Sequence, residues 1–238
     1  MSMNRTIMIS DIHGCLVDLD QLLNTISFDS RVDQLFLLGD FVDRGPNSKE
    51  TVERVMQLVQ QHHAIALRGN HDQRLVDLIR NSNKDVRRKF LEHGGLQTIQ
   101  SYLHSEVLEL NDDVLDSATD YIGKNFMDHI RFLENLPLYY EDDSHIYVHA
   151  GLNPNYPNWR EQPDYDFMYI KDEFIYSRMR FDKPVVFGHT RTSDIHGSPD
   201  VWFQEDRIGI DGGCAYGLQL NGLIYENGTY KTVKVGSR

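Results

Sequence analysis

An α/β fold is the class that this sequence of 238 residues predicts, and three observations support the prediction. Five short apolar runs each end in glycine and polar residues, as buried strands do. Two amphipathic segments lie between the first three of these runs. After Val201, several short runs separated by turn residues indicate antiparallel strands. Strands that alternate with helices at the start of a chain are typical of a layered α/β sandwich.

The predicted strands are rich in branched and aromatic residues. They are Thr6–Ile9, Leu35–Leu38, Ala64–Leu67, Ile146–Val148 and Val185–Phe187. Within a few residues, each strand is followed by Asp, Asn or His. In layered α/β folds, the groups that bind ligands gather just beyond the carboxyl ends of strands. Because five predicted strands end in such residues, we predict that these residues form one shared ligand-binding site.

Helices are predicted between the first three strands. Their apolar faces consist of Leu16, Leu19, Leu22, Leu23 and Ile26, and of Val52, Val55, Met56 and Val59. The second helix begins after Pro46, and Asn47 followed by Glu50 has the spacing of a capping pair. The result is a strand–helix–strand–helix–strand order, for which a right-handed crossover is expected.

Residues 73–136 contain no run typical of a strand, and their apolar residues have helical spacing. Leu75, Leu78 and Ile79 indicate a helix that continues from the third strand. We interpret this segment as a helical insertion beside the site. It could be a cap that shapes the substrate site, or a helical layer with no role in binding.

Four short apolar runs in the last part of the chain predict antiparallel strands. The runs are Trp202–Phe203, Ile208–Ile210, Leu220–Tyr225 and Tyr230–Val235. Asn227-Gly228 between the last two is a strong signal for a two-residue hairpin turn. No internal repeat or linker divides the sequence, so we expect a single domain over residues 1–238 with the insertion at about 73–136.

The composition is that of an ordinary globular protein, with 40% apolar and 25% charged residues. The first ten residues lack the features of a signal peptide, and no run is long enough for a membrane span. The chain has only two cysteines, which is too few for a disulfide framework. We therefore expect a cytoplasmic protein without a membrane partner. The net charge of −12 argues against nucleic acid as a partner. An anionic substrate would need a local source of positive charge.

Asp, His and Asn side chains, without cysteine, suit a hard or borderline divalent ion such as Mn²⁺, Fe²⁺ or Zn²⁺. Asp11 and His13 are two residues apart at a strand end, so they share a face and can reach one ion. A carboxylate such as Asp40 can bridge two ions. The residues that would complete the second ion's ligands are Asn70, His149 and His189. Two ions roughly 3.5–4 Å apart activate water for an in-line phosphoryl displacement.

Five sequence blocks carry a resemblance to a known family. They are Asp11-Ile12-His13-Gly14, Gly39-Asp40-Phe41-Val42-Asp43-Arg44-Gly45, Gly69-Asn70-His71-Asp72, His149-Ala150-Gly151 and Gly188-His189-Thr190. They resemble the phosphoprotein-phosphatase branch of the calcineurin-like metallophosphoesterases. Within that branch they are most similar to small bacterial and phage-type serine/threonine phosphatases and to symmetric diadenosine tetraphosphate hydrolases. The resemblance implies a four-layer αββα sandwich of two mixed β-sheets flanked by helices, with a helical insertion.

The resemblance also implies a role for each residue. Asp11, His13 and Asp40 would hold the first of two divalent ions, and Asp40, Asn70, His149 and His189 the second. Mn²⁺ is the expected metal, with Fe or Zn as alternatives. His71 would be the general acid that protonates the leaving oxygen, Asp43 would orient its imidazole, and Arg44 would bind phosphate oxygens.

Several residues leave alternatives open. Lys171 stands where relatives often carry arginine, so it is either a weaker phosphate contact or a surface residue. Gly212 stands where relatives commonly carry threonine, and Arg68 could brace its loop. Cys15 is expected to be a small buried filler. The aromatic residues before Lys171 could stack on a base, although a core role is the expected one; they are Tyr156, Trp159, Tyr165, Phe167 and Tyr169.

The predicted function is hydrolysis of phosphomonoesters by a hydroxide that bridges the two metals. Phosphoserine or phosphothreonine in proteins is the expected substrate. The alternative is symmetric cleavage of dinucleoside tetraphosphates to ADP, since the sequence blocks are shared. A nuclease is disfavoured because such relatives commonly carry Gly-His-x-His in the last block, whereas Arg191 stands at the second His position. A binding module without catalysis is disfavoured because every ligand and His71 are intact.

Overall fold

The computed structural model describes residues 5–104, 111–178 and 180–236. Its first sheet has the order β10-β9-β1-β2-β3. These strands are β1 (Arg5–Ile9), β2 (Asp33–Leu37), β3 (Ile65–Ala66), β9 (Gln219–Glu226) and β10 (Thr229–Gly236). The first three run parallel, and the hairpin of β9 and β10 joins them through an antiparallel pair between β1 and β9. The sheet is therefore mixed, as predicted.

The second sheet has the order β4-β5-β6-β8-β7. Its strands are β4 (Tyr139–Glu141), β5 (Ile146–Val148), β6 (Val185–Phe187), β7 (Trp202–Gln204) and β8 (Arg207–Gly209). β5, β6 and β8 are parallel, whereas β4 and β7 are antiparallel edge strands. The two hairpins predicted after Val201 are thus present but belong to different sheets. In the second of them, Asn227 and Gly228 both have positive φ, as their turn type requires.

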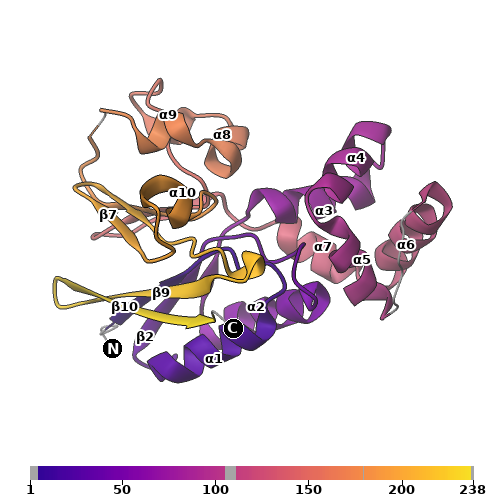
Figure 1. Cartoon of the computed structure of the whole chain (residues 1–238), viewed down its shortest axis with the longest axis horizontal. Coiled ribbons are helices and arrows are strands. Elements are labelled where there is room, and N and C mark those ends of the chain that lie inside the picture. Colours follow the sequence, from indigo (N-terminus) through magenta and orange to yellow (C-terminus); the bar gives the residue numbers. More distant parts are fainter. Residues whose placement is uncertain (1–4, 105–110, 179, 237–238) are drawn as a thin grey trace.

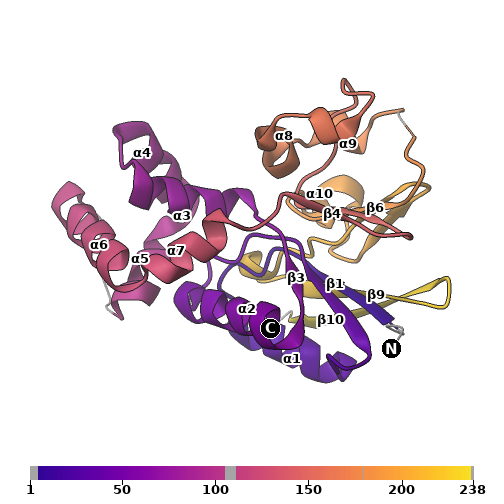
Figure 2. The same ribbon diagram turned by 180° about the vertical axis from the view of Figure 1, so that it is seen from behind.

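The two sheets pack face to face between layers of helices (Figures 1 and 2). Phe36 of β2 and Tyr147 of β5 stack across this interface with ring centroids 3.9 Å apart. Helices α1 (Leu16–Ile26) and α2 (Ser48–His62) cover the outer face of the first sheet. The other outer layer contains α8 (Asp164–Tyr169), α9 (Asp172–Ile175) and α10 (Thr192–His196). The predicted α/β sandwich of four layers is confirmed.

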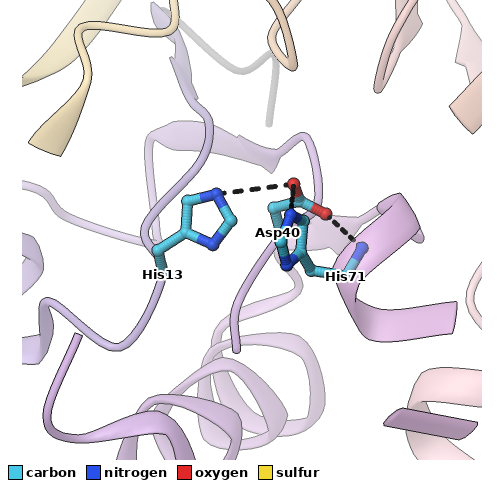
Figure 3. Close-up of side chains that lie close together, drawn as sticks. All are labelled: His13, Asp40 and His71. Carbon is cyan, nitrogen blue, oxygen red and sulfur yellow. Dashed lines mark hydrogen bonds and ion pairs between the residues drawn. The ribbon is translucent and has the colours of Figure 1, made fainter. Parts of the chain in front are cut away.

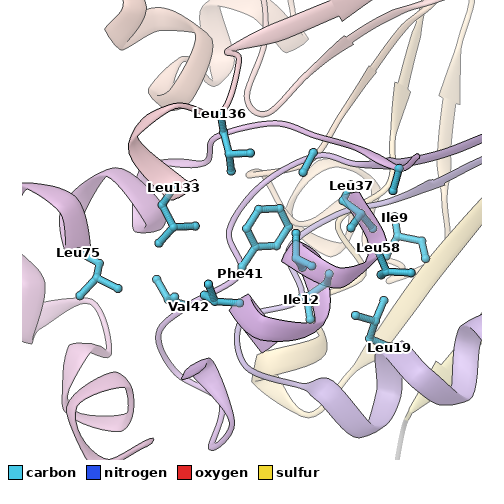
Figure 4. Packing of buried hydrophobic residues seen from close by; sticks show 14 of the residues in the cluster. Ile9, Ile12, Leu19, Leu37, Phe41, Val42, Leu58, Leu75, Leu133 and Leu136 are labelled. Carbon is cyan, nitrogen blue, oxygen red and sulfur yellow. The ribbon is translucent and has the colours of Figure 1, made fainter. Parts of the chain in front are cut away.

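The insertion is helical over its described residues, as predicted. It contains α3 (Asn70–Arg80), α4 (Lys84–Glu92), α5 (Gly95–Leu103), α6 (Asp112–Asn125) and α7 (Met127–Glu134). Leu75 of α3 and Leu133 of α7 are fully buried and belong to the same apolar cluster as Phe41, beyond β2 (Figure 4). The helices therefore share a continuous core with the first sheet, and part of the predicted segment, residues 105–110, lies outside the described residues.

Two local details differ from the sequence predictions. Asn47 is the N-terminal cap residue of α2, but its side chain makes no capping hydrogen bond. The Glu50 carboxylate instead accepts a hydrogen bond from Ser101 Oγ at 3.1 Å, because α5 packs against this turn. Strand β4 and helices α8 to α10 were not predicted, since segments this short carry little periodicity. None of the helices described is long and apolar enough to cross a membrane.

Candidate metal centre and active site

The predicted metal ligands all lie just beyond the carboxyl ends of strands, at an edge that the two sheets share. Asp11 and His13 follow β1, Asp40 follows β2 and Asn70 follows β3. His149 follows β5, and His189 follows β6. His189 is half-buried and the other five are buried. The Asp11 carboxylate accepts a hydrogen bond of 2.9 Å from the backbone N–H of His189, across 178 positions of sequence. The structure brings all six residues together.

The backbone at this edge is held in an unusual conformation. Left-handed φ angles between 47° and 71° occur at Asp11, His13, Asp40, Asp43, Arg44 and His189. Such angles cost energy for residues other than glycine and persist only where surrounding contacts impose them. Here the backbone N–H of His13 donates to Asp40 O at 2.8 Å, and that of Arg44 to Gly94 O at 3.0 Å. The loops are therefore locked against one another, with their side chains aimed at one region.

Asp40 occupies the position expected of a bridging carboxylate. Its Oδ2 lies 3.5 Å from His13 Nε2 and 3.5 Å from His149 Nε2. Two ligand atoms that each lie roughly 2.1 Å from one ion are separated by roughly 3–3.5 Å, so both distances suit a shared cation. Figure 3 shows Asp40 between the side chains of His13 and His71. Asp40 belongs to two groups that could hold a metal ion: one with His13 and His71, the other with His149 and His189.

Two of the histidines are fixed in the tautomer that metal binding needs. Nδ1 of His13 lies 2.8 Å from Val42 O, and Nδ1 of His149 lies 2.8 Å from Leu38 O. In a neutral imidazole, a ring nitrogen this close to a carbonyl donates its proton to it, so the lone pair is on Nε2. In His13 that lone pair accepts from Arg44 Nη1 in this structure. In both residues that Nε2 is the atom that faces Asp40.

Asn70 gives a direct test of whether a cation fits. Its side-chain oxygen lies 2.9 Å from both His149 Nε2 and His189 Nδ1. When both ring nitrogens are unprotonated, their lone pairs and the amide oxygen repel one another unless a cation lies among them. Without a cation, the amide would turn over and donate to both imidazoles, while its oxygen accepted from Arg74. The donor set therefore fits a divalent ion of the hard or borderline type.

Burial and charge set the protonation states of these ligands. Burial lowers the pKa of His13 to about 4 and that of His189 well below its usual value, so both are neutral. Burial opposes ionisation of Asp40, but His149 and the neighbouring imidazoles outweigh it and hold the pKa of Asp40 far below its usual range. Burial also acts to lower the pKa of His149, yet Asp40 and Asp11 raise it. Cations between these groups would take the place of that proton.

His71 lies beside the ligands in the geometry expected of an oriented acid. Its Nδ1 is 2.7 Å from Asp43 Oδ2, and Thr98 Oγ1 donates to the other oxygen of Asp43 at 2.7 Å. On the opposite side of the ring, Nε2 lies 2.8 Å from Arg44 Nη2 and 2.9 Å from Arg74 Nη1. The imidazole is therefore hydrogen-bonded to Asp43 on one side, while two cations face the nitrogen that points into the cleft.

The ligands open into a cleft of about 220 Å³ with a positive lining. Four cationic side chains line it: Arg44, Arg74, Lys171 and Arg191. The guanidinium groups of Arg44 and Arg191 lie 5.0 and 4.4 Å from the ring centroid of Tyr216, which supports them from one side. The local positive charge that an anionic substrate needs is therefore present, in spite of the net charge of −12.

The model of the calcineurin-like phosphoesterase family matches residues 5–210. The chain belongs to this family. The metallophosphoesterase is 27% identical to an asymmetrical bis(5′-nucleosyl)-tetraphosphatase PrpE of Anoxybacillus flavithermus, with 96% of this chain and 93% of that protein covered. It is 32% identical to a symmetrical bis(5′-nucleosyl)-tetraphosphatase of Nitrosococcus oceani, with 64% of this chain and 52% of that protein covered.

A solved structure assigned provisionally as a diadenosine tetraphosphatase is also similar to this metallophosphoesterase. It has a TM-score of 0.62 and 25% sequence identity, with 98% of this chain and 94% of that chain covered. Membership of the family makes the protein a hydrolase that uses a binuclear centre of divalent metal ions. The fold and family implied by the five sequence blocks are thereby confirmed.

We did not predict from the sequence that Arg74 and Asp72 of this metallophosphoesterase belong to the site. Arg74 is three residues after His71 on α3, so the two share a helix face, and that spacing could have revealed it. Asp72 is the last residue of the block Gly69-Asn70-His71-Asp72, and the sequence predicted no role for it. Its carboxylate accepts hydrogen bonds from the backbone N–H groups of Asp40, Phe41 and Gly69 at 2.8–2.9 Å, which holds two of the metal loops together.

The structure resolves most of the open alternatives. Lys171 lines the cleft and is exposed to solvent. Arg68 Nη1 donates to Glu134 O at 2.8 Å and so braces its loop. A side chain at position 212 would place its Cβ 2.4 Å from Gln219 O, which explains glycine there. Cys15 is half-buried rather than buried, and its sulfur, that of Cys214 and a carboxylate oxygen of Asp18 lie within 4.8 Å of one another.

Two glycines that precede metal ligands have no room for a side chain. A Cβ at Gly69 would lie 2.1 Å from Asp40 Oδ1, and one at Gly188 would lie 2.1 Å from Asp11 Oδ2. We expect Gly69→Ala and Gly188→Ala each to lower Mn²⁺ affinity at least tenfold, as measured by calorimetric titration. At Gly123, in α6, the nearest atom to an added Cβ is 3.7 Å away. Gly123→Ala should keep Mn²⁺ affinity and stabilise the fold by about 0.5–1 kcal/mol. Wild-type affinity in the first two variants would contradict the assignment of these loops.

Proposed function

We propose that this metallophosphoesterase hydrolyses dinucleoside tetraphosphates, with Mn²⁺ as the expected metal. The observation that carries the proposal is the positive lining of the cleft. Arg44, Arg74, Lys171 and Arg191 line one small cleft in an acidic protein, together with Asp40, Asp194 and Asp211. Asp194 pairs with Arg191 at 3.0 Å, so the charge of the other three cations is the one most open to a ligand. A single phosphate monoester has oxygens for one or two such groups, whereas a chain of four phosphates has partners for all of them. The names of the relatives support the same substrate class.

The proposed metal ligands are the six residues at the shared sheet edge. Asp11, His13 and Asp40 would hold one ion, and Asp40, Asn70, His149 and His189 the other. The ions would supply an activated water and neutralise the charge on the phosphoryl oxygens. Asp11 Oδ1, at 3.9 Å from His13 Nε2, is close enough to share an ion with it.

We propose that side chains around the cleft carry out the remaining steps. His71 would take up a proton at Nε2 once Arg44 and Arg74, which in this structure donate to that nitrogen, bind the phosphate instead. It would then give the proton to the leaving phosphate oxygen, while Asp43 keeps the ring in place. Arg44 and Arg74 lie within 3 Å of that nitrogen, so they are positioned to bind the oxygens of the same phosphate group. The two guanidinium groups would also stabilise the charge that develops on the leaving group.

Phosphoserine or phosphothreonine in proteins was the first substrate predicted from the sequence blocks. That prediction rests on the blocks and on membership of the family. The named relatives favour the alternative, so we reverse the order of the two. We also propose that the chain forms one domain and that α4 to α7 act as a cap beside the cleft.

The test is incubation of the Mn²⁺-loaded protein with diadenosine tetraphosphate and, separately, with a panel of phosphoserine and phosphothreonine peptides. We expect nucleotide release to exceed phosphate release from any peptide by at least tenfold in kcat/KM. Chromatography of the products identifies the bond cleaved, since ADP alone means symmetrical cleavage and ATP with AMP means asymmetrical cleavage. Rapid peptide dephosphorylation with intact diadenosine tetraphosphate would overturn the proposal.

A further inference from the structure

A second hollow, of about 370 Å³, lies directly beside the metal cleft. It is bounded by α3, α4 and α8, and Arg74 and Tyr169 line both spaces. Figure 1 shows α8 and α4 on the same side of the molecule, above the end of α3. A ligand that has a phosphate in the metal cleft can therefore extend past Arg74 and Tyr169 into this hollow.

Two tyrosines of α8 form an aromatic platform in this hollow. The rings of Tyr165 and Tyr169 are stacked with centroids 4.3 Å apart and an angle of 10° between their planes. Tyr169 is also 6.3 Å from the ring of His189, so the platform starts at the metal centre. Tyr165 is 63% exposed, whereas Trp159 and Phe167, from the same predicted aromatic group, are buried in the core. The core role predicted for the group is therefore wrong for Tyr165.

The exposed platform has the properties of a base-stacking site. A large, flat ring that faces solvent gains when another ring covers it, and every nucleobase offers such a face. The ring of Tyr165 is already held parallel to that of Tyr169, so less conformational entropy is lost when a base stacks on it. In addition, Arg74 lies 5.5 Å from the centroid of Tyr169, at the point where phosphate and base would meet.

The other residues of the hollow suit a sugar and a base rather than another phosphate. Asp77 and Asp85 would repel a phosphate but can accept hydrogen bonds from ribose hydroxyls. The amide nitrogen of Gln73 donates to Asp77, and the amide oxygen of Asn83 caps α4. The other ends, Gln73 Oε1 and Asn83 Nδ2, can pair with the polar edge of a base.

We propose that this hollow is the nucleoside subsite, in which a purine base stacks on Tyr165. The inference rests on the proposed function, because it assigns one end of the dinucleoside substrate to α8 and the α3–α4 region. It gives the insertion a role in substrate specificity, since Asn83, Asp85 and Lys89 come from α4 and the turn before it.

The test compares AMP with ribose 5-phosphate, which lacks the base. Dissociation constants are measured by calorimetry on the Mn²⁺-loaded protein, so the result does not depend on turnover of any tetraphosphate. We expect AMP to bind at least tenfold more tightly than ribose 5-phosphate, since stacking on an aromatic ring is worth about 1–3 kcal/mol per base. Tyr165→Ala should remove most of this ratio and leave the affinity for ribose 5-phosphate unchanged.

Tyr176→Ala is the matched variant, because Tyr176 is also 63% exposed and is not among the residues that line the hollow. It should keep the wild-type ratio. A ratio near one in the wild type, or an undiminished ratio in Tyr165→Ala, would overturn the subsite. Failure of the proposed function would instead appear as intact diadenosine tetraphosphate, whatever the ratio between the two small ligands.

Discussion

Replacement of His71 by asparagine is expected to lower kcat for the preferred substrate by about 10²- to 10⁴-fold, the usual contribution of a positioned acid. The reason is the arrangement around its ring. Asp43 holds Nδ1 at 2.7 Å, and Nε2 faces the cleft between Arg44 and Arg74. Asparagine can keep a hydrogen bond to Asp43 but cannot hold a transferable proton near the leaving oxygen. Steady-state kinetics and metal analysis of the same preparation provide the measurement.

His93→Asn is the matched variant for this experiment. His93 also lines the cleft, with its ring centroid 6.2 Å from that of His71, but its Nδ1 lies 2.7 Å from Lys89 O. It should keep kcat within about threefold of wild type. The assignment of His71 as the acid fails if His71→Asn keeps full kcat. It also fails if the loss of kcat comes entirely with a loss of metal, since His71 would then be a ligand.

Asp40→Asn is expected to abolish activity because the variant cannot hold both ions. The carboxylate lies 3.5 Å from the imidazoles of His13 and His149, and no other side chain belongs to both metal-binding groups among the described residues. Loss of a residue that only supports a ligand costs about 10- to 100-fold in metal affinity, so loss of a shared ligand should exceed 100-fold. Elemental analysis after dialysis against Mn²⁺ should show less than one ion per chain, against two in the wild type.

Asp33→Asn separates this effect from a general loss of stability. Asp33 is also a buried aspartate, at the start of β2, where it pairs with Arg5 at 2.6 Å, and it belongs to neither group that includes Asp40. Its replacement should lower Tm because it breaks a buried ion pair, yet the folded variant should bind two ions. Two tightly bound ions in Asp40→Asn would contradict the bridging role.

The cluster of candidate ligands could be predicted from the sequence because its signals are local. Each ligand follows an apolar run within a few residues, and glycine stands immediately before Asp40, Asn70 and His189. Parallel strands bring such positions to one edge of a sheet whatever the details of packing. The strand–helix alternation was equally clear, since α1 and α2 have well-defined apolar faces.

Other features could not be predicted because they depend on contacts between distant segments. Nothing in the sequence after Val201 showed that one hairpin would extend the first sheet and the other the second. The Tyr165 ring and the buried Trp159 belong to the same aromatic stretch, and only the packing of α8 separates an exposed ring from a core residue. Thr98, which orients Asp43, lies 55 positions away from it. Such residues are found only once the fold is known.

The central claim is that two divalent ions share Asp40 at the edge where the two sheets meet. Anomalous diffraction at the manganese edge, from crystals grown with Mn²⁺, tests it most directly. We expect two peaks roughly 3.5–4 Å apart with Asp40 between them. One ion should contact Asp11 and His13, and the other Asn70, His149 and His189. A single peak, a pair of peaks without Asp40 between them, or a peak only at Cys15, Asp18 and Cys214 would contradict it.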